Sequence, residues 1–344
     1  MVRDTLYARS QDAPADRGTA RTNRLAALVR WETAVVLALL LVVVGASLGV
    51  DGFADGRNAE FLLLDAVAVL LIALPVTLVV ITGEIDLSVA STLGLCSAVM
   101  GQLWLSGWPL ELIVVAAIAL GAVLGAVNGL FVTGFGLPSL AVTIGTLAAY
   151  RGLAFVVLGD QAVADFPTDW TRAAADTVAG GALPWAMVIA LVLAVGFGVT
   201  LHLTPFGRQL YAIGNNAQAA AFTGIPVARA KFWLFVASGA VAGLAGVYWT
   251  LRYASARADN GEGLELSVVA AVLLGGVSIF GGRGTLLGVL AGVLLLATLR
   301  NALQLADVRA DTLDIVTGVL LIASVVVPNV VALARARRRR GRPT

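Results

Sequence analysis

The stretch Phe61–Thr82 reads FLLLDAVAVLLIALPVTLVVIT and carries one charged residue, Asp65. A helix needs about 20 consecutive, mostly apolar residues to cross a bilayer core of roughly 30 Å. A run of this length and composition therefore predicts a transmembrane helix. Gly83 follows the run directly and is expected to end the helix.

Apolar runs of similar or slightly shorter length lie on both sides of this stretch. Only Gly281–Gly284 separates the eighth run from the ninth, and both are short, so we expect shorter or tilted helices there. The pattern predicts an all-α, polytopic membrane protein with about ten transmembrane helices. The runs cover residues 33–50, 61–82, 87–106, 110–133, 138–158, 184–203, 231–250, 266–280, 284–300 and 312–333.

The composition excludes a water-soluble protein of this length. Of the 344 residues, 59% are hydrophobic and 13% are charged, whereas soluble domains average about 25% charged residues. The chain has one His, His202, and one Cys, Cys96, which excludes a His-rich metal site and an intramolecular disulfide. We expect no metal, no cofactor and no catalytic residues, because no nucleophile or ligand set accompanies the acidic residues.

Loop charges indicate the orientation of the helices. An even number of spans places both termini on the same side of the membrane. With both termini in the cytoplasm, sixteen of the 23 Lys and Arg residues lie on the cytoplasmic side, as the positive-inside rule expects. The predicted parts are a cytoplasmic N-terminal tail (1–30), a transmembrane domain (31–333) with a cytoplasmic segment at 204–230, and a basic cytoplasmic C-terminal tail (334–344). The long first apolar run favours a retained helix over a cleaved signal peptide. The Arg-rich end follows a span directly, which favours attraction to anionic lipid over nucleic-acid binding.

The segment 204–230 carries signals for a short helix. Asn216 is a good N-cap residue, Ala217–Phe222 favours helix, and Gly224 with Pro226 ends it. We expect a helix at the cytoplasmic surface whose small Ala face fits a groove on a partner protein. An interfacial helix without a partner is the alternative.

Small and polar residues within the spans suggest close packing and a cavity. Gly121, Gly125 and Gly129 repeat every four residues, which lets a neighbouring helix approach closely. Polar side chains at membrane depth are costly and tend to line a cavity, although Ser and Thr can also bond to their own helix backbone. The pathway candidates are Asn128, Thr143, Thr146 and Ser278, with Ser238, Thr250, Ser267, Thr298, Asn301 and Gln304 in the wider set.

Three polar residues follow the Phe61–Thr82 run: Glu84, Asp86 and Ser88. We expect water to reach Glu84 and Asp86 at this helix boundary, with Asp86 or Ser88 capping the third helix. The alternative for the acidic residues is an ion pair with cytoplasmic Arg residues during gating.

The run Gln218–Ile225 (QAAAFTGI) resembles the E-A-A-x-x-x-G-I coupling loop of ABC importer permeases, with Gln218 in place of the leading Glu. Three further stretches resemble the branch that includes the ribose, rhamnose and autoinducer-2 permeases, in the order of that family and over about residues 31–333. They are GEIDLSVAS at 83–91, the group NGL, LPS, TIGTL and YRG within 128–152, and LGGVS with GGRG within 274–284.

The resemblance implies the membrane-spanning permease subunit of an ABC importer for a monosaccharide or sugar-like solute of the rhamnose, autoinducer-2 or ribose type. It also implies a multi-pass location in the bacterial plasma membrane. The chain is expected not to be an enzyme, since the pattern G-x-x-x-x-G-K-[ST] is absent and a separate chain must hydrolyse ATP. In the family the coupling loop docks on the ATPase subunit, so the coupling candidates are Asn216, Gln218, Ala219, Ala220, Gly224 and Ile225.

The implied partners are two copies of an ATP-binding subunit, a second permease subunit in a homo- or heterodimer, an extracytoplasmic solute-binding protein and membrane lipid. Most aromatic residues near the outer boundaries are expected to anchor at the membrane interface, with one or two left to stack on a sugar ring. They are Trp104, Trp108, Trp170, Trp185, Tyr248, Trp249 and Tyr253.

An ion-coupled secondary transporter is the alternative function. Such a protein couples through ionisable residues inside the membrane, and Asp65, Glu84 and Asp86 are the acidic residues to consider. A membrane enzyme would need a clustered set of catalytic groups, and the sequence gives none.

Overall fold

The computed structural model of the chain describes residues 31–309, 312–324 and 326. Within these residues the regular structure is helical, apart from two isolated β-bridges, Val163–Ala256 and Thr177–Pro184. The predicted tails at 1–30 and 334–344 lie outside the described residues, as does most of the stretch after Ser324.

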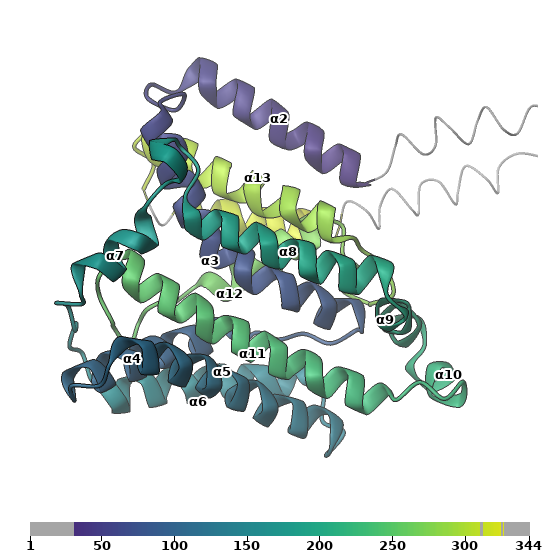
Figure 1. Cartoon of the computed structure of the whole chain (residues 1–344). Coiled ribbons are helices and arrows are strands. Elements are labelled where there is room, and N and C mark those ends of the chain that lie inside the picture. The colour runs from purple at the N-terminus through teal and green to yellow at the C-terminus, as the bar shows by residue number, and fades with distance from the viewer. Residues whose placement is uncertain (1–30, 310–311, 325, 327–344) are drawn as a thin grey trace, which may run out of the picture.

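The helices are connected by short loops, and most run roughly along one common direction (Figure 1). They are α2 (Trp31–Gly49), α3 (Gly56–Ile81), α4 (Val89–Leu105), α5 (Leu110–Thr133), α6 (Ser139–Leu158), α7 (Thr168–Ala175), η1 (Val178–Gly180), α8 (Trp185–Leu203), α9 (Pro205–Asn215), α10 (Ala217–Phe222), α11 (Val227–Arg252), α12 (Leu264–Leu274) and α13 (Leu286–Leu305), with a last helix over Thr312–Ser324.

The predicted fold class is confirmed. Seven described helices are long and apolar enough to cross a membrane, and three shorter apolar helices, α4, α12 and Thr312–Ser324, bring the number to the ten that were predicted. The eighth run was expected to reach residue 280, but α12 ends at Leu274. Gly275 and Gly276 follow it, and Gly276 has a φ of +91°, which glycine adopts without strain and other residues avoid.

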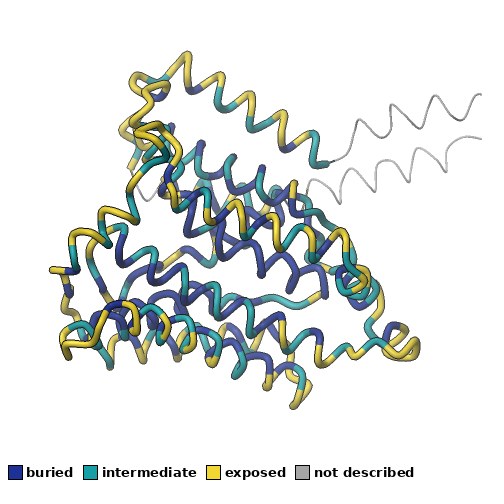
Figure 2. Tube along the Cα trace, viewed as in Figure 1, coloured by how far each residue is buried: buried dark blue, intermediate teal, exposed yellow. Residues whose placement is uncertain are grey.

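The helix predicted from Phe61–Thr82 is the centre of the molecule. In α3, 89% of the most apolar 18-residue stretch is buried inside the chain, and nearly every residue from Leu64 to Ile81 is buried. It packs against α8, α12 and α13 on one side and against α11 on the other. Figure 2 shows it as the most continuously buried trace.

Glycine ridges set how closely the other helices approach. A Cβ atom on Gly121 or Gly125 of α5 would overlap the backbone of α11 at Gly239 and Phe235. Gly288 and its partner Gly292 on α13 meet the backbone of α12 in the same way. The close packing predicted from the spacing of Gly121, Gly125 and Gly129 is therefore present between α5 and α11, and α12 and α13 form a second tightly packed pair.

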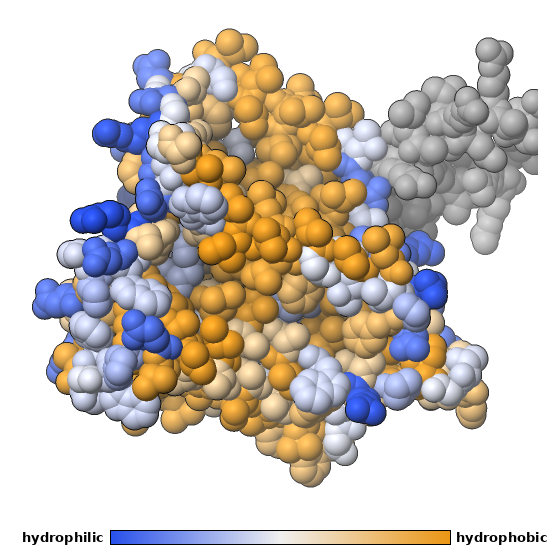
Figure 3. All heavy atoms as spheres, in the orientation of Figure 1, coloured by the Kyte–Doolittle hydropathy of each residue, from blue (hydrophilic) through white to orange (hydrophobic). Residues whose placement is uncertain are grey.

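The outer surface of the helices is apolar over most of the face in Figure 3. α2 contributes much of this apolar surface, since only 11% of its most apolar 18-residue stretch is buried. α2 packs against α13. The indole Nε1 of Trp31 donates to the Leu274 carbonyl at 2.8 Å and fixes the start of α2. An apolar surface of this extent is what a lipid environment requires.

The two ends of the molecule differ. One end, called the α10 end, carries α9 and α10, and the opposite end, called the α7 end, carries α7 (Figure 1). α3 finishes at the α10 end, where the Ile81 carbonyl accepts from the Gly282 amide at 2.9 Å.

Candidate functional site

The cytoplasmic segment predicted at 204–230 forms two short helices at the α10 end. Asn216 caps α10, and its Oδ1 accepts from the Ala219 amide at 2.9 Å. Gly224, with φ of +85°, ends the turn after α10. The helix over Ala217–Phe222 and both of its boundary signals are confirmed.

The helix α9 was not predicted. Thr204 caps it by accepting from the Gly207 amide at 3.2 Å, and Pro205 occupies its first turn. A Thr cap followed by Pro at the first helical position is a recognised start signal, so the sequence did contain the information. α9 buries Leu210 and Ile213 against the core and thereby holds α10 at a fixed place.

The six coupling candidates separate into two groups. Asn216, Gln218, Ala219 and Gly224 are exposed. Ala220 is buried and Ile225 packs against the main core, so these two position the loop rather than offer a contact surface.

The most exposed large side chain of this loop was missed by the sequence reasoning. Phe222 is 93% exposed at the end of α10. It lies two residues from the buried Ala220, which places it on the opposite side of the helix. A large exposed aromatic side chain at a helix tip is typical of an interaction anchor.

Four glycines meet at the junction behind α10. A Cβ atom on Gly214, at the end of α9, would overlap the Ile81 carbonyl and the Gly282 amide. Gly281 has a φ of +80° and lies against the backbone of Gly83. The end of α9, the end of α3 and the turn before α13 therefore touch through backbone alone.

The 83–88 segment (Gly83–Ser88) leads from this junction to α4 and is held by side chains from three other helices. Lys231 on α11 forms an ion pair with Glu84, and both side chains are mostly buried, with 14% and 16% of their areas exposed. The Ile85 amide donates to Ser139 Oγ at 3.1 Å on α6. The pairing of Glu84 uses the only Lys in the chain, not the Arg residues that the sequence suggested.

Asp86 forms the centre of a buried polar cluster. Its Oδ1 accepts from the Ser88 amide at 3.1 Å and from Ser88 Oγ at 2.7 Å, and its Oδ2 accepts from Ser238 Oγ at 2.8 Å. Asn128 Nδ2 donates to Ser88 Oγ at 2.7 Å, while the buried Oδ1 of Asn128 has no hydrogen-bond partner among the described residues. The cluster ties the 83–88 segment to α5 and α11.

Two parts of the expectations for this segment are wrong, the exposure of Asp86 and the cap by Ser88. Asp86 is 2% exposed, so water does not reach it in this conformation. Ser88 stands at the N-cap position of α4 but makes no capping hydrogen bond, because its hydroxyl donates to Asp86 instead. Local sequence suggested a cap, whereas α5 and α11 close over the carboxylate and redirect both groups.

The four pathway candidates do not form one group. Asn128 and Thr143 are buried next to the 83–88 segment, and Thr143 Oγ1 donates to the carbonyls of Ile85 and Ser139. Thr146 bonds to carbonyls of its own helix, and Ser278 lies in the turn before α13, where its Oγ accepts from the Phe280 amide. Their role in a pathway stays a prediction.

Comparison with known proteins identifies the class. The family described as the permease component of branched-chain amino acid transport systems matches residues 58–325. The chain belongs to this family of multi-pass membrane permeases, which confirms the resemblance to ABC importer permeases.

The similar proteins are autoinducer 2 import permeases. The chain is 33% identical to the autoinducer 2 import system permease protein LsrD of Yersinia enterocolitica, over 86% of this chain and 91% of the relative. It is 31% identical to LsrD of Salmonella paratyphi B, over 86% and 90%, and 34% identical to LsrC of Enterobacter sp., over 79% and 78%. No solved structure matches the chain.

Proposed function

We propose that this chain is the membrane-spanning subunit of an ABC importer that moves a monosaccharide or sugar-like solute into the cytoplasm, with ATP hydrolysed by a separate subunit. The observation that carries the proposal is α10, a capped helix that presents Phe222, Gln218 and Ala219 to water at one end of an apolar helical body. The α10 end is then the cytoplasmic end, and we propose that both termini are cytoplasmic.

The arrangement behind α10 supports a mechanical role. Four residues separate the end of α10 from the start of α11, and α11 holds the 83–88 segment at Lys231 and at Ser238. These two residues are seven apart, so they lie on one face of α11 about two turns from each other. A partner that displaces α10 therefore pulls α11, and α11 carries with it the segment that begins α4.

The partners follow from the family. We propose two copies of an ATP-binding subunit at the α10 end, a second permease subunit in a homo- or heterodimer, and a solute-binding protein at the α7 end. The names of the relatives favour autoinducer 2 as the solute, with rhamnose and ribose as the other candidates.

Reconstitution tests the proposal. The chain is placed in liposomes with its proposed ATPase, permease and binding-protein partners and with ATP, and uptake of labelled solute is measured. Uptake should require ATP and stop when the ATPase is omitted. Uptake by the chain alone, driven by a proton or sodium gradient, would refute the proposal and favour a secondary transporter.

Co-purification tests the coupling surface separately. Gly224→Glu places a charge on the exposed turn and forces a residue with a Cβ atom into positive φ, a strain of roughly 1–2 kcal/mol. We expect loss of ATPase co-purification with membrane insertion intact. Gly224→Asn, which tolerates positive φ, is the matched control and should keep its partner; retention by both variants counts against the assignment.

A further inference from the structure

A cavity of about 510 Å³ lies between α3, α12, α13 and the helix Thr312–Ser324. It is separate from the 83–88 segment and from α10. Its volume falls within the range of small-molecule sites, roughly 300–1,000 Å³. Ser267, Asn301 and Gln304, three of the wider polar candidates, line it, together with Trp249 and Tyr253.

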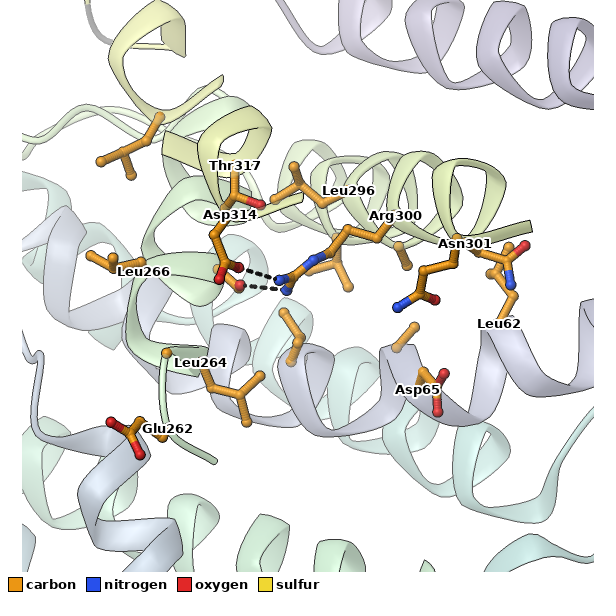
Figure 4. Close-up of a pocket in the computed structure, with 18 of the residues that line it drawn as sticks. Leu62, Asp65, Glu262, Leu264, Leu266, Leu296, Arg300, Asn301, Asp314 and Thr317 are labelled. Carbon is orange, nitrogen blue, oxygen red and sulfur yellow. Dashed lines mark hydrogen bonds and ion pairs between the residues drawn. The ribbon is translucent and has the colours of Figure 1, made fainter. Parts of the chain in front are cut away.

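The polar groups of the cavity remain accessible. Arg300 bridges Ser267 Oγ at 3.0 Å and Asp314 Oδ1 at 2.9 Å, and the two charged side chains keep 35% and 77% of their areas exposed (Figure 4). Asp65 on α3, with 53% of its side chain exposed, accepts from the Tyr253 hydroxyl at 3.2 Å. The side chains of Glu262 and Gln304 line the cavity and make no hydrogen bond within the described part of the chain.

The exposure of Asp65 indicates that this space is aqueous. Asp65 lies four residues into the apolar run that begins at Phe61, about 6 Å along the helix axis at 1.5 Å per residue, and 53% of its side chain is exposed. An exposed carboxylate within a membrane span is costly unless water or polar groups face it. An apolar lipid chain is therefore the wrong occupant for this wall.

The charges do not favour an anionic ligand. The three acidic side chains Asp65, Glu262 and Asp314 line the cavity, and they are opposed by Arg300 in the lining and by Arg252 beside it, whose NH2 lies 4.0 Å from Asp65, so one negative charge remains in excess. No group of three or more metal-ligating side chains occurs among the described residues, which leaves a hydroxyl-rich ligand as the best fit. Amide and carboxylate groups offer both donors and acceptors for hydroxyl groups.

The aromatic pair adds an apolar wall. Trp249 and Tyr253 pack with ring centroids 5.0 Å apart, and both line the cavity. Aromatic faces beside amide and carboxyl groups suit a sugar ring, whose C–H faces are apolar and whose edges carry hydroxyls.

We propose that this cavity binds a small neutral polyol, such as a monosaccharide or autoinducer 2, within a single permease subunit. The assignment of the ligand class rests on the proposed function, in which the chain carries such a solute. It goes further by giving the permease its own solute site at the α7 half, in addition to selection by the binding protein.

Direct binding to the assembled transporter tests the site. The permease complex with its ATPase, free of binding protein, is held in nanodiscs and titrated with a labelled panel of pentoses, hexoses, deoxyhexoses and autoinducer 2. We expect saturable binding of at least one member. Gln304→Leu and Glu262→Gln should each weaken it roughly fivefold, the scale of one lost hydrogen bond.

Gln102→Leu, at the exposed end of α4 and outside the cavity lining, is the matched control and should bind as the wild type does. Absence of saturable binding across the panel, or binding that both cavity variants leave unchanged, overturns the site. The titration is repeated with and without phosphatidylglycerol, because a lipid headgroup offers the same hydroxyls. Sugar binding that disappears when this lipid is present assigns the cavity to lipid and overturns the solute site.

The two proposals fail differently. If no solute binds to the permease complex but ATP-driven uptake with the binding protein is intact, only the cavity site is refuted. Uptake without an ATPase removes the proposed function whatever the titration shows.

Discussion

The ion pair between Glu84 and Lys231 gives the sharpest test of the coupling route. It joins the 83–88 segment to the second turn of α11, and 14–16% of the two side chains is exposed. We consider the single variants Glu84→Gln and Lys231→Met and the double variant that combines them. Each single variant leaves the opposite charge largely buried without its partner.

The size of the effect follows from burial. Breaking a fully buried pair by removing one partner costs about 3–5 kcal/mol. Because some water reaches both groups, we expect roughly 2–3 kcal/mol for each single variant. On the scale of about 2 °C per kcal/mol for a large domain, that corresponds to a fall in Tm of roughly 4–6 °C.

The double variant should be more stable than the sum of the two single losses implies, because no unpaired charge remains. Thermal unfolding of the purified complex in detergent gives all four values of the cycle, and ATP hydrolysis stimulated by the binding protein reports coupling. Both single variants should lose most of that stimulation. Asp169→Asn, which breaks the exposed pair with Arg172 at the α7 end, is the control and should change neither quantity. Strictly additive losses in the cycle would refute the reasoning.

Three other substitutions test the α10 end and its support. Phe222→Asp should weaken ATPase association by about 30-fold or more, as expected for an aromatic anchor. Phe135→Ala, which removes another exposed aromatic side chain outside α10, should leave the affinity unchanged. Equal affinities of the two variants for the ATPase, measured by surface plasmon resonance, would exclude Phe222 as the anchor. Gly214→Ala should destabilise by about 1–3 kcal/mol through overlap with Ile81 and Gly282. Gly145→Ala on α6, where no atom of the described residues lies within 4 Å of the added Cβ, should leave Tm unchanged or slightly raised. A larger fall in Tm for Gly145→Ala than for Gly214→Ala would contradict the packing. Asn216→Ala should lower stability by about 1 kcal/mol through loss of the cap, measured as the shift in Tm, and no shift would mean that α10 does not need its cap.

Features encoded in consecutive residues were predicted well. The ten spans follow from the lengths of the apolar runs, since a bilayer of fixed thickness leaves few alternatives. The boundaries of α10 follow from Asn216 and Gly224, because a cap and a positive φ act on the backbone within a few residues. The glycine spacing on α5 likewise indicated a close helix contact, although not that α11 is the partner.

Contacts between distant segments could not be predicted in this way. Asp86 is sealed by Ser238, 152 residues away, and Glu84 pairs with Lys231, 147 residues away. The cavity combines residues from α3, α11, α12, α13 and the last helix. Phe222 looked like one more apolar residue until the burial of Ala220 fixed which side of α10 faces water.

The sequence by itself determined the membrane environment, the number of spans and the capped helix in the 204–230 segment, because each depends on local composition or on backbone geometry over a few residues. Only the tertiary structure decided which polar groups meet, which are sealed from water and which remain open in a cavity. Burial and pairing are properties of helices packed against one another, and one-dimensional patterns do not specify which faces will touch.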